Sequence, residues 1–224
     1  MAPRALFATA MATGLLAGGA LVYLFGAGGG NGFLAQAAEP VEIAPGIVET
    51  AECALSDEDF ETIETATVGD VAAMLPMERP ISLAGLAFDD PNGEPTTMGD
   101  LPGVKLLNLW ATWCAPCRAE MPHLDELQAS EGEAGAFEVV ALNVDVGDPG
   151  KPLDFLAEIG IEHMAHYRDD TLGTFNALRE AGLAQGLPVT VLVAGDGCTL
   201  AAMNGPANWA SPDAVALIDA ARSL

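Results

Sequence analysis

The fold is decided by the stretch Val104-Lys105-Leu106-Leu107-Asn108-Leu109-Trp110-Ala111-Thr112-Trp113-Cys114-Ala115-Pro116-Cys117. Its first half is an almost continuous apolar run, which is typical of a buried central strand. A helix is expected immediately afterwards, from about Ala115 to Ala129. The two cysteines therefore stand where a buried strand meets the N-terminus of a helix.

Strands and helices alternate downstream of this junction. Apolar runs predict strands at residues 137–144 and 189–193, and a returning strand at 198–203. Helices are expected at residues 152–159 and 171–181, and a last helix runs through 222 with Ser211 as its N-cap and Pro212 in its first turn. This order predicts an α/β domain whose mixed central sheet is flanked by helices on both faces.

A β-hairpin is expected at the N-terminal start of this domain, and a helical extension is expected before it. Apolar segments at residues 86–88 and 96–98 flank the turn signal Asn92-Gly93. Residues 52–75 read as helical, with Ser56 and Asp59 as a capping box. A second short helix is expected at residues 68–75, ended by Pro76.

The N-terminus has the character of a membrane anchor. Residues 5–25 are uncharged and give about 20 residues, the length of a single transmembrane helix. Arg4 precedes this segment and acidic residues follow it, so the positive-inside rule places the rest of the chain outside the cytoplasm. A cleaved signal peptide ending at Ala35-Gln36-Ala37 and a buried soluble helix are the alternatives. The expected organisation is an anchor at 1–25, a linker at 26–50, the helical extension at 51–79 and the main domain at 80–224.

The charge of the chain excludes one class of partner. Lys and Arg number 8 and Asp and Glu number 32, which gives a net charge of −24. Nucleic-acid binding needs a Lys/Arg footprint, so no nucleic-acid partner is expected. The acidic residues are spread along the chain and indicate a solvated acidic surface.

The chemistry is expected at Cys114 and Cys117. A cysteine at a helix N-terminus faces unpaired N–H groups and the positive end of the helix dipole, which lower the pKa of its thiol. Cys117 follows one turn later on the same face, close enough to form a disulfide with Cys114. Pro116 fits the first helical turn because no N–H is needed there. The pair can therefore exchange disulfides through a mixed-disulfide intermediate.

A metal site is the alternative interpretation of two cysteines at this spacing. Zinc would need a second pair of ligands at matching spacing. Cys53 and Cys198 stand alone, His123 is interpreted as a surface histidine, and His163 and His166 form an isolated pair. No metal and no cofactor are expected.

Pro188 is a further candidate because it directly precedes a predicted strand. A proline there removes one donor from the sheet, and a cis peptide bond would be one reason to keep it. Base rates alone favour trans.

The segment from Leu107 to Pro122, Leu-Asn-Leu-Trp-Ala-Thr-Trp-Cys-Ala-Pro-Cys-Arg-Ala-Glu-Met-Pro, resembles the signature of the TlpA/ResA-type family of membrane-anchored thioredoxins. The resemblance covers about residue 80 to the C-terminus. It implies a thioredoxin fold and the activity of a thiol:disulfide oxidoreductase.

The same resemblance assigns roles to several residues. Gly186-Leu187-Pro188-Val189-Thr190 is similar to the family's cis-proline loop, so Leu187–Pro188 is expected to be cis and to hold the substrate backbone beside Cys114. Four residues are expected to contact the substrate: Trp113, Ala115, Pro116 and Leu187. Trp110 is expected to serve the core or the rim of the site.

The resemblance also points to Glu120 and to a second disulfide. Asn108 stands where thioredoxin carries a buried acid, so Glu120 is expected either to accept a proton or to tune the thiolate, unless it is an ordinary solvated glutamate. Cys53 and Cys198 are expected to form a structural disulfide that ties the N-terminal extension to the closing hairpin.

The implied function is reduction of protein disulfides in the periplasm. The expected substrates are cytochrome oxidase assembly or copper-site proteins, or proteins of cytochrome c biogenesis, with a role in cell redox homeostasis. The reductant would sit on the bacterial inner membrane through a single-pass anchor and take electrons from a transmembrane donor. A periplasmic oxidant or isomerase and a copper-binding chaperone that uses the cysteine pair are the alternatives.

Overall fold

The computed structural model describes residues 39–132 and 135–224. The expected anchor at 1–25 and the candidate cleavage site at 35–37 lie outside these ranges. Within the ranges described, none of the helices combines the length and the apolar character needed to span a bilayer.

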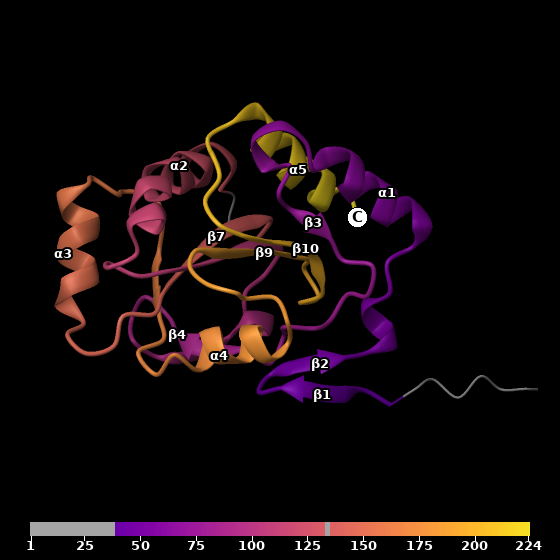
Figure 1. The fold of residues 1–224 in the computed structure, drawn as a ribbon, viewed down its shortest axis with the longest axis horizontal. Helices are drawn as coiled ribbons and strands as arrows, with labels where there is room; N and C mark the ends of the chain where they lie inside the picture. Colours follow the sequence, from indigo (N-terminus) through magenta and orange to yellow (C-terminus); the bar gives the residue numbers. More distant parts are fainter. Residues whose placement is uncertain (1–38, 133–134) are drawn as a thin grey trace, which may run out of the picture. The chain divides into compact units, whose positions relative to one another are not determined.

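A mixed sheet of eight strands forms the centre of the described chain (Figure 1). Its strands are β3 (Leu75–Pro76), β4 (Ala87–Asp89), β5 (Pro95–Thr97), β6 (Val104–Trp110), β7 (Phe137–Asn143), β8 (His166–Arg168), β9 (Val189–Val193) and β10 (Thr199–Asn204). They lie in the order β3-β10-β9-β6-β7-β8-β4-β5. β6 is parallel to β7 and antiparallel to β9. The predicted mixed sheet is confirmed.

Helices cover both faces of the sheet, as predicted. They are α1 (Asp57–Ala66), α2 (Ala115–Glu131), α3 (Gly150–Glu158), α4 (Gly173–Glu180) and α5 (Pro212–Arg222). Figure 1 shows α2 and α5 above the sheet, with α1 packed beside α5, and α4 below it.

Strand β6 is the innermost element, since all seven of its residues are buried. They include Lys105, whose ammonium donates to the carbonyls of Leu101 (3.1 Å) and Gly195 (3.3 Å). Burial lowers the pKa of Lys105 because it disfavours the charged form. Packing on both faces of the sheet therefore holds β6, the strand that precedes Cys114 in the chain, in place.

Two local predictions on the N-terminal side are confirmed. Ser56 accepts a hydrogen bond from the Asp59 N–H and Asp59 accepts one from the Ser56 N–H, which completes the capping box of α1. The Asn92-Gly93 turn joins β4 to β5, and Gly93 takes the positive φ of 79° that favours glycine.

The predicted second helix at residues 68–75 is wrong. Only a 3₁₀ turn forms there, at Gly69–Val71, and Leu75 joins the edge of the sheet opposite Ala202 of β10. Gly69 has a φ of +54° and sits against the carboxylate of Asp213, an arrangement that suits a turn rather than a helix. Pairing with the sheet therefore overrode a weak helical pattern.

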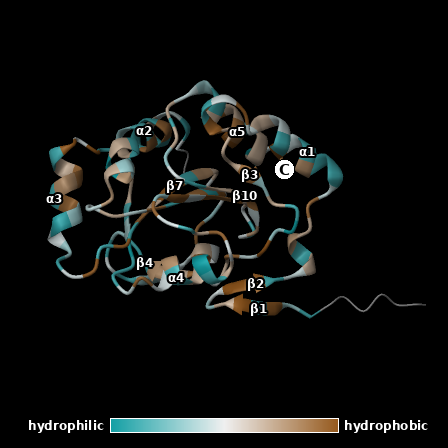
Figure 2. Ribbon diagram, in the orientation of Figure 1, coloured by the Kyte–Doolittle hydropathy of each residue, from teal (hydrophilic) through white to brown (hydrophobic). Residues whose placement is uncertain are grey.

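The linker expected at residues 26–50 contains folded structure at its C-terminal end. A hairpin forms from β1 (Val41–Ala44) and β2 (Ile47–Glu49), with Gly46 at a φ of +74° between them. The hairpin is coloured as hydrophobic in Figure 2. Ala44 and Ile47 are buried, and Val48 bridges to Ser82 of the main domain, so the segment is fastened by packing.

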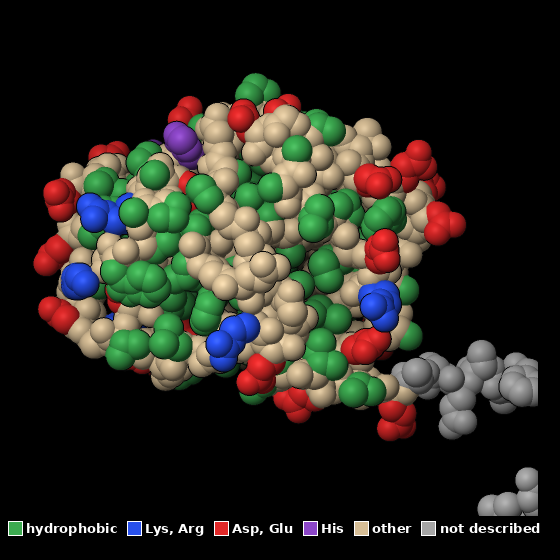
Figure 3. Space-filling view, viewed as in Figure 1, with side chains coloured by type: hydrophobic (Ala, Val, Ile, Leu, Met, Phe, Trp, Pro, Cys, Tyr) green, Lys and Arg blue, Asp and Glu red, His purple; other side chains and the backbone are tan. Residues whose placement is uncertain are grey.

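Acidic side chains are spread over the face drawn in Figure 3, and basic ones are few. This agrees with the net charge of −24. On this face the acidic residues are not gathered in one patch.

A disulfide joins Cys53, in the 3₁₀ turn Ala51–Cys53, to Cys198 at the start of β10. Both cysteines are buried, and 145 residues separate them in sequence. The bond connects the N-terminal extension to the turn between β9 and β10, where Ser82 also bridges to Cys198.

Removing this bond should destabilise the protein. Replacing both cysteines in the variant Cys53→Ser/Cys198→Ser is expected to lower the free energy of unfolding by about 3–5 kcal/mol, because the long closed loop restricts the unfolded chain. Urea unfolding of the oxidised proteins measures the change. An unchanged midpoint would show that the bond does not stabilise the extension.

Candidate active site

Cys114 and Cys117 form a disulfide at the start of α2. Cys114 is the N-cap of the helix, and its Sγ accepts a hydrogen bond from the Cys117 N–H at 3.3 Å. A thiolate at this position would be stabilised by the same N–H group and by the helix dipole. The local sequence thus builds a site for a sulfur anion.

The two sulfurs differ in access. Cys114 is 5% exposed, whereas Cys117 is fully buried. Only Cys114 therefore offers an edge to an incoming disulfide, and Cys117 can react only with Cys114. This asymmetry separates an attacking cysteine from a resolving one.

Apolar side chains surround the exposed edge of Cys114. Trp113 is 66% exposed, although it is one of the largest apolar residues of the chain. Ala115 and Pro116, which follow Cys114 in the chain, are exposed as well. A polypeptide that reached Cys114 would have to lie against these side chains.

The proline loop lies at the same end of the sheet. Leu109 of β6 pairs with Val189 of β9, so Pro188, just before Val189, stands beside the junction that carries the cysteines. The Leu187–Pro188 bond is cis, Pro188 is buried and Leu187 is half-buried. The Pro188 carbonyl accepts a hydrogen bond from the Gly205 N–H at 2.9 Å, which ties the loop to the residues that follow β10.

Glu120 is buried on the face of α2 that carries Cys117 and is not a solvated helix residue. It is 1% exposed and lies three residues after Cys117 on the same helix, so both side chains share one face. Its carboxylate accepts hydrogen bonds from Asn108 Nδ2 (2.8 Å), Trp209 Nε1 (3.1 Å) and the Ala207 N–H (3.2 Å). Every one of these partners comes from another element of the fold.

The pKa of Glu120 is raised to about 7, because burial disfavours the charged carboxylate. The three hydrogen bonds lower the pKa and offset part of this effect. A carboxyl group with a pKa near 7 can both accept and release a proton at neutral pH.

Asn108 connects Glu120 to the proline loop. The Asn108 amide also donates to Thr190 Oγ1 at 2.9 Å, and Thr190 lies two residues after Pro188. The side-chain oxygen of Asn108, Oδ1, is buried without a hydrogen-bond partner. The network therefore spans α2, β6, β9 and the loop after β10.

The loop before the cysteines is held by Asp145, which follows β7. The Asp145 carboxylate accepts from the Thr112 N–H (2.8 Å), Thr112 Oγ1 (3.0 Å) and Asn143 Nδ2 (2.9 Å). Asp145 is 4% exposed. Since Thr112 is two residues before Cys114, this carboxylate holds the loop between β6 and Cys114 in place.

Sequence reasoning missed Trp209, Thr190 and Asp145. Trp209 is far along the chain and carries no motif, so no local signal links it to Glu120. Thr190 and Asp145 could have been found, because each lies at an end of a predicted strand. The C-terminal end of β7 and the N-terminal end of β9 lie next to the C-terminal end of β6, which leads to the cysteines.

Trp110, which was expected to serve the core or the rim of the site, belongs to the core. Trp110 is fully buried and packs against Phe155, so it serves the core. In the part of the chain that the structure describes, no three His, Cys, Asp or Glu side chains are grouped so that they could hold a metal ion.

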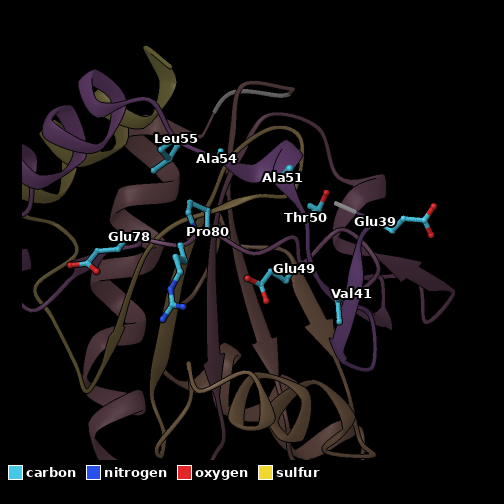
Figure 4. Close-up of a pocket in the computed structure, with 10 residues that line it drawn as sticks. Glu39, Val41, Glu49, Thr50, Ala51, Ala54, Leu55, Glu78 and Pro80 are labelled. Carbon is cyan, nitrogen blue, oxygen red and sulfur yellow. The ribbon is translucent and has the colours of Figure 1, made fainter. Parts of the chain in front are cut away.

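A pocket of about 500 Å³ lies elsewhere on the described chain. Figure 4 shows it between the segment around Thr50 and the segment around Pro80, with Glu49 and Glu78 among its lining side chains. None of its lining residues belongs to α2, β6 or the proline loop. It takes no part in the cysteine site.

Comparison with known proteins places these features in a family. Residues 80–218 match the family described as Redoxin. A DsbE homolog of Paracoccus denitrificans, named as a thiol:disulfide interchange protein, is 34% identical over 131 residues, which cover 54% of this chain and 59% of that protein. The thiol:disulfide interchange protein HelX of Rhodobacter capsulatus is 31% identical over 169 residues, covering 75% of this chain and 85% of HelX.

Solved structures agree on the fold. The thiol:disulfide interchange protein DsbE from Chlorobium tepidum is 28% identical, with a TM-score of 0.50 over 61% of this chain and 92% of its own. A secreted thiol-disulfide isomerase from Corynebacterium glutamicum, 23% identical, has a TM-score of 0.52 over 66% of this chain and 92% of its own, and bears on the fold alone. The expected thioredoxin-like α/β fold is confirmed, and the names of the relatives agree with the expected enzyme class.

Proposed function

The chain belongs to the Redoxin family, and on that premise we propose that it is a thiol:disulfide oxidoreductase that reduces disulfides in other proteins. The observation that carries the proposal is the difference between its two sulfurs, an edge-exposed Cys114 at a helix N-terminus and a fully buried Cys117. This is the arrangement that two-step disulfide exchange needs.

The proposed reaction begins with both cysteines reduced. The Cys114 thiolate attacks one sulfur of the substrate disulfide, and the other substrate sulfur leaves as a thiolate. Cys117 then loses its proton and attacks Cys114, which releases the second substrate thiol. Two electrons pass to the substrate, and the Cys114–Cys117 disulfide remains.

Glu120 is proposed to accept the proton from Cys117. Cys117 is fully buried, so water has no direct access to its thiol, and Glu120 shares its helix face. The pKa of Glu120, about 7, leaves a substantial fraction of the carboxyl group ionised and ready to accept a proton at neutral pH.

The substrate backbone is proposed to lie between two rims. One rim consists of Trp113, Ala115 and Pro116 around Cys114. The other consists of Leu187 and Pro188 at the start of β9. The pairing of Val189 with Leu109 of β6 supports this role, because it places the second rim next to the strand that leads to the first. The hydrogen bond from the Gly205 N–H to the Pro188 carbonyl holds the second rim to the residues that follow β10.

Reduction is the direction we favour. Strongly oxidising pairs depend on a very stabilised thiolate, and the two residues between these cysteines, Ala115 and Pro116, add no charge or imidazole to stabilise it. The proposed substrates are disulfide-bearing proteins of cytochrome oxidase assembly, of copper sites or of cytochrome c biogenesis. The proposed location is the periplasmic face of the bacterial inner membrane, with an N-terminal anchor and a transmembrane electron donor.

Serine variants test the proposal. Cys114→Ser should lose all thiol exchange, because the attacking sulfur is gone. Cys117→Ser should accumulate mixed disulfides between Cys114 and substrate proteins, because nothing resolves them. Non-reducing electrophoresis and mass spectrometry of the membrane fraction of cells producing each full-length variant measure both effects. Exchange activity in Cys114→Ser, or mixed disulfides at Cys117 in place of Cys114, would contradict the mechanism.

The role of Glu120 predicts a pH dependence. In the native chain the resolving step should slow as the pH falls below about 7, because a protonated Glu120 can no longer accept a proton. In Glu120→Gln the step should be about 100-fold slower at pH 8 and should show no inflection near pH 7. Acid quenching of single turnovers, followed by mass spectrometry of the mixed disulfide, measures the step.

Glu126→Gln is the matched control for Glu120→Gln. Glu126 lies on the same helix but is exposed. The Glu126→Gln variant should keep the native rate of the resolving step and its native dependence on pH. If Glu120→Gln also kept both, Glu120 would not be the proton acceptor.

A further inference from the structure

Two of the most exposed apolar side chains of the described chain each follow a residue of the hydrogen-bonded pair Thr112 and Asp145, which holds the loop before Cys114. Val146 is 68% exposed and Trp113 is 66% exposed, and of the described residues only Leu75 is as exposed among the large apolar ones, at 68%. Trp113 follows Thr112, and Val146 follows Asp145. Thr112 and Asp145 are the two residues that the hydrogen bonds described above join.

The backbone that carries Val146 is held on both sides. On one side the Asp145 carboxylate is bound to Thr112. On the other, Arg168 Nη2 donates to the Gly147 carbonyl at 2.7 Å and lies 3.4 Å from the Asp145 carbonyl. An apolar side chain on a fixed backbone can be covered by a partner with little loss of backbone entropy. Exposed apolar surface of this kind marks sites of interaction.

We propose that Val146 and Trp113 together form a docking surface for an apolar side chain that neighbours the reactive cysteine of a polypeptide substrate. The inference rests on the proposed function and adds a substrate preference to it. In the mixed disulfide, the substrate sulfur is about 2 Å from Cys114 Sγ. The residues next to the substrate cysteine are about 3.8 Å away along its chain, measured between Cα atoms. They must therefore lie against the side chains that surround Cys114.

Charge gives no comparable selection at this end of the molecule. The neighbouring groove, about 410 Å³, starts at Thr112 and carries basic and acidic residues together. Its charged lining residues are Arg118, Lys151, Asp148, Asp154 and Glu158. These two basic and three acidic side chains nearly cancel in charge within the groove, and we therefore assign the substrate preference to apolar contact with Trp113 and Val146.

Two synthetic peptide disulfides test the preference. One is the homodimer of Gly-Leu-Cys-Leu-Gly and the other the homodimer of Gly-Ser-Cys-Ser-Gly, each joined through its cysteine. The freshly reduced full-length chain is mixed with each, and the released thiol peptide is quantified by chromatography. Each turnover oxidises Cys114 and Cys117 to their disulfide and converts one peptide disulfide into two thiols. The readout is the ratio of the two second-order rate constants for this single turnover, measured with each peptide disulfide in excess over the reduced chain.

The native chain should favour the leucine peptide about tenfold, the effect expected when part of a leucine side chain is removed from water. Val146→Ser should reduce the ratio to about threefold or less, because a hydroxyl replaces the apolar contact. Leu75→Ser is the matched control, since Leu75 is equally exposed but lies on β3 at the edge of the sheet. It should keep the native ratio.

Two results would overturn the docking surface while leaving the proposed function intact. They are a ratio near one in the native chain, or the same ratio in Val146→Ser as in the native chain. If the native chain reduced neither peptide, the proposed function itself would fail, and the docking surface with it. Circular dichroism confirms that each variant is folded, and Val146→Leu, which adds apolar surface, should raise the ratio.

Discussion

The burial of β6 is the constraint on which the site depends. All seven residues of this strand are buried, and the strand is hydrogen-bonded to β7 on one side and to β9 on the other. These contacts hold the C-terminal end of β6 in a single position. Helix α2 starts five residues after Trp110 with Cys114 as its N-cap, and Cys114 therefore stands where the sheet and the helix N-terminus meet. The partial positive charge of that helix end is the source of the thiol's expected acidity. Any change that moved β6 would move the nucleophile.

Long-range contacts complete what β6 begins. Glu120 is held by Asn108 of β6 and by Ala207 and Trp209 from the loop after β10, so its buried carboxylate is assembled from three parts of the chain. Desolvation of this group is stronger than the hydrogen bonds that favour its charge, and its pKa rises to about 7. Cys114 keeps a small exposed edge, whereas Cys117 and Glu120 have almost no contact with water, and this difference underlies their different roles.

The sequence predicted the elements that have strong local signals. The apolar run of β6, the strand Val189–Val193, the capping box at Ser56 and the turn at Asn92-Gly93 were all found, because each is encoded within a few residues. The hairpin at residues 41–49 and the strand at Leu75 were not found, since each is stabilised by partners elsewhere in the fold.

The same division holds within the candidate site. Cys114 and Cys117 were evident from their spacing and their position after a strand. The burial of Glu120 could not be decided from the sequence, because the residues that cover it, such as Trp209, are 89 positions away. The contact of Thr112 with Asp145 likewise joins two strand ends that are 33 residues apart.

The central claim is that the Cys114–Cys117 pair is a reductant, and its reduction potential tests this most directly. The full-length chain is equilibrated in glutathione or dithiothreitol buffers of known potential. The reduced fraction of the peptide that contains both cysteines is then measured by alkylation and mass spectrometry. The account predicts a value below about −200 mV, towards that of thioredoxin. A value near −120 mV, roughly that of a strong oxidant, would contradict it and indicate a protein that forms disulfides.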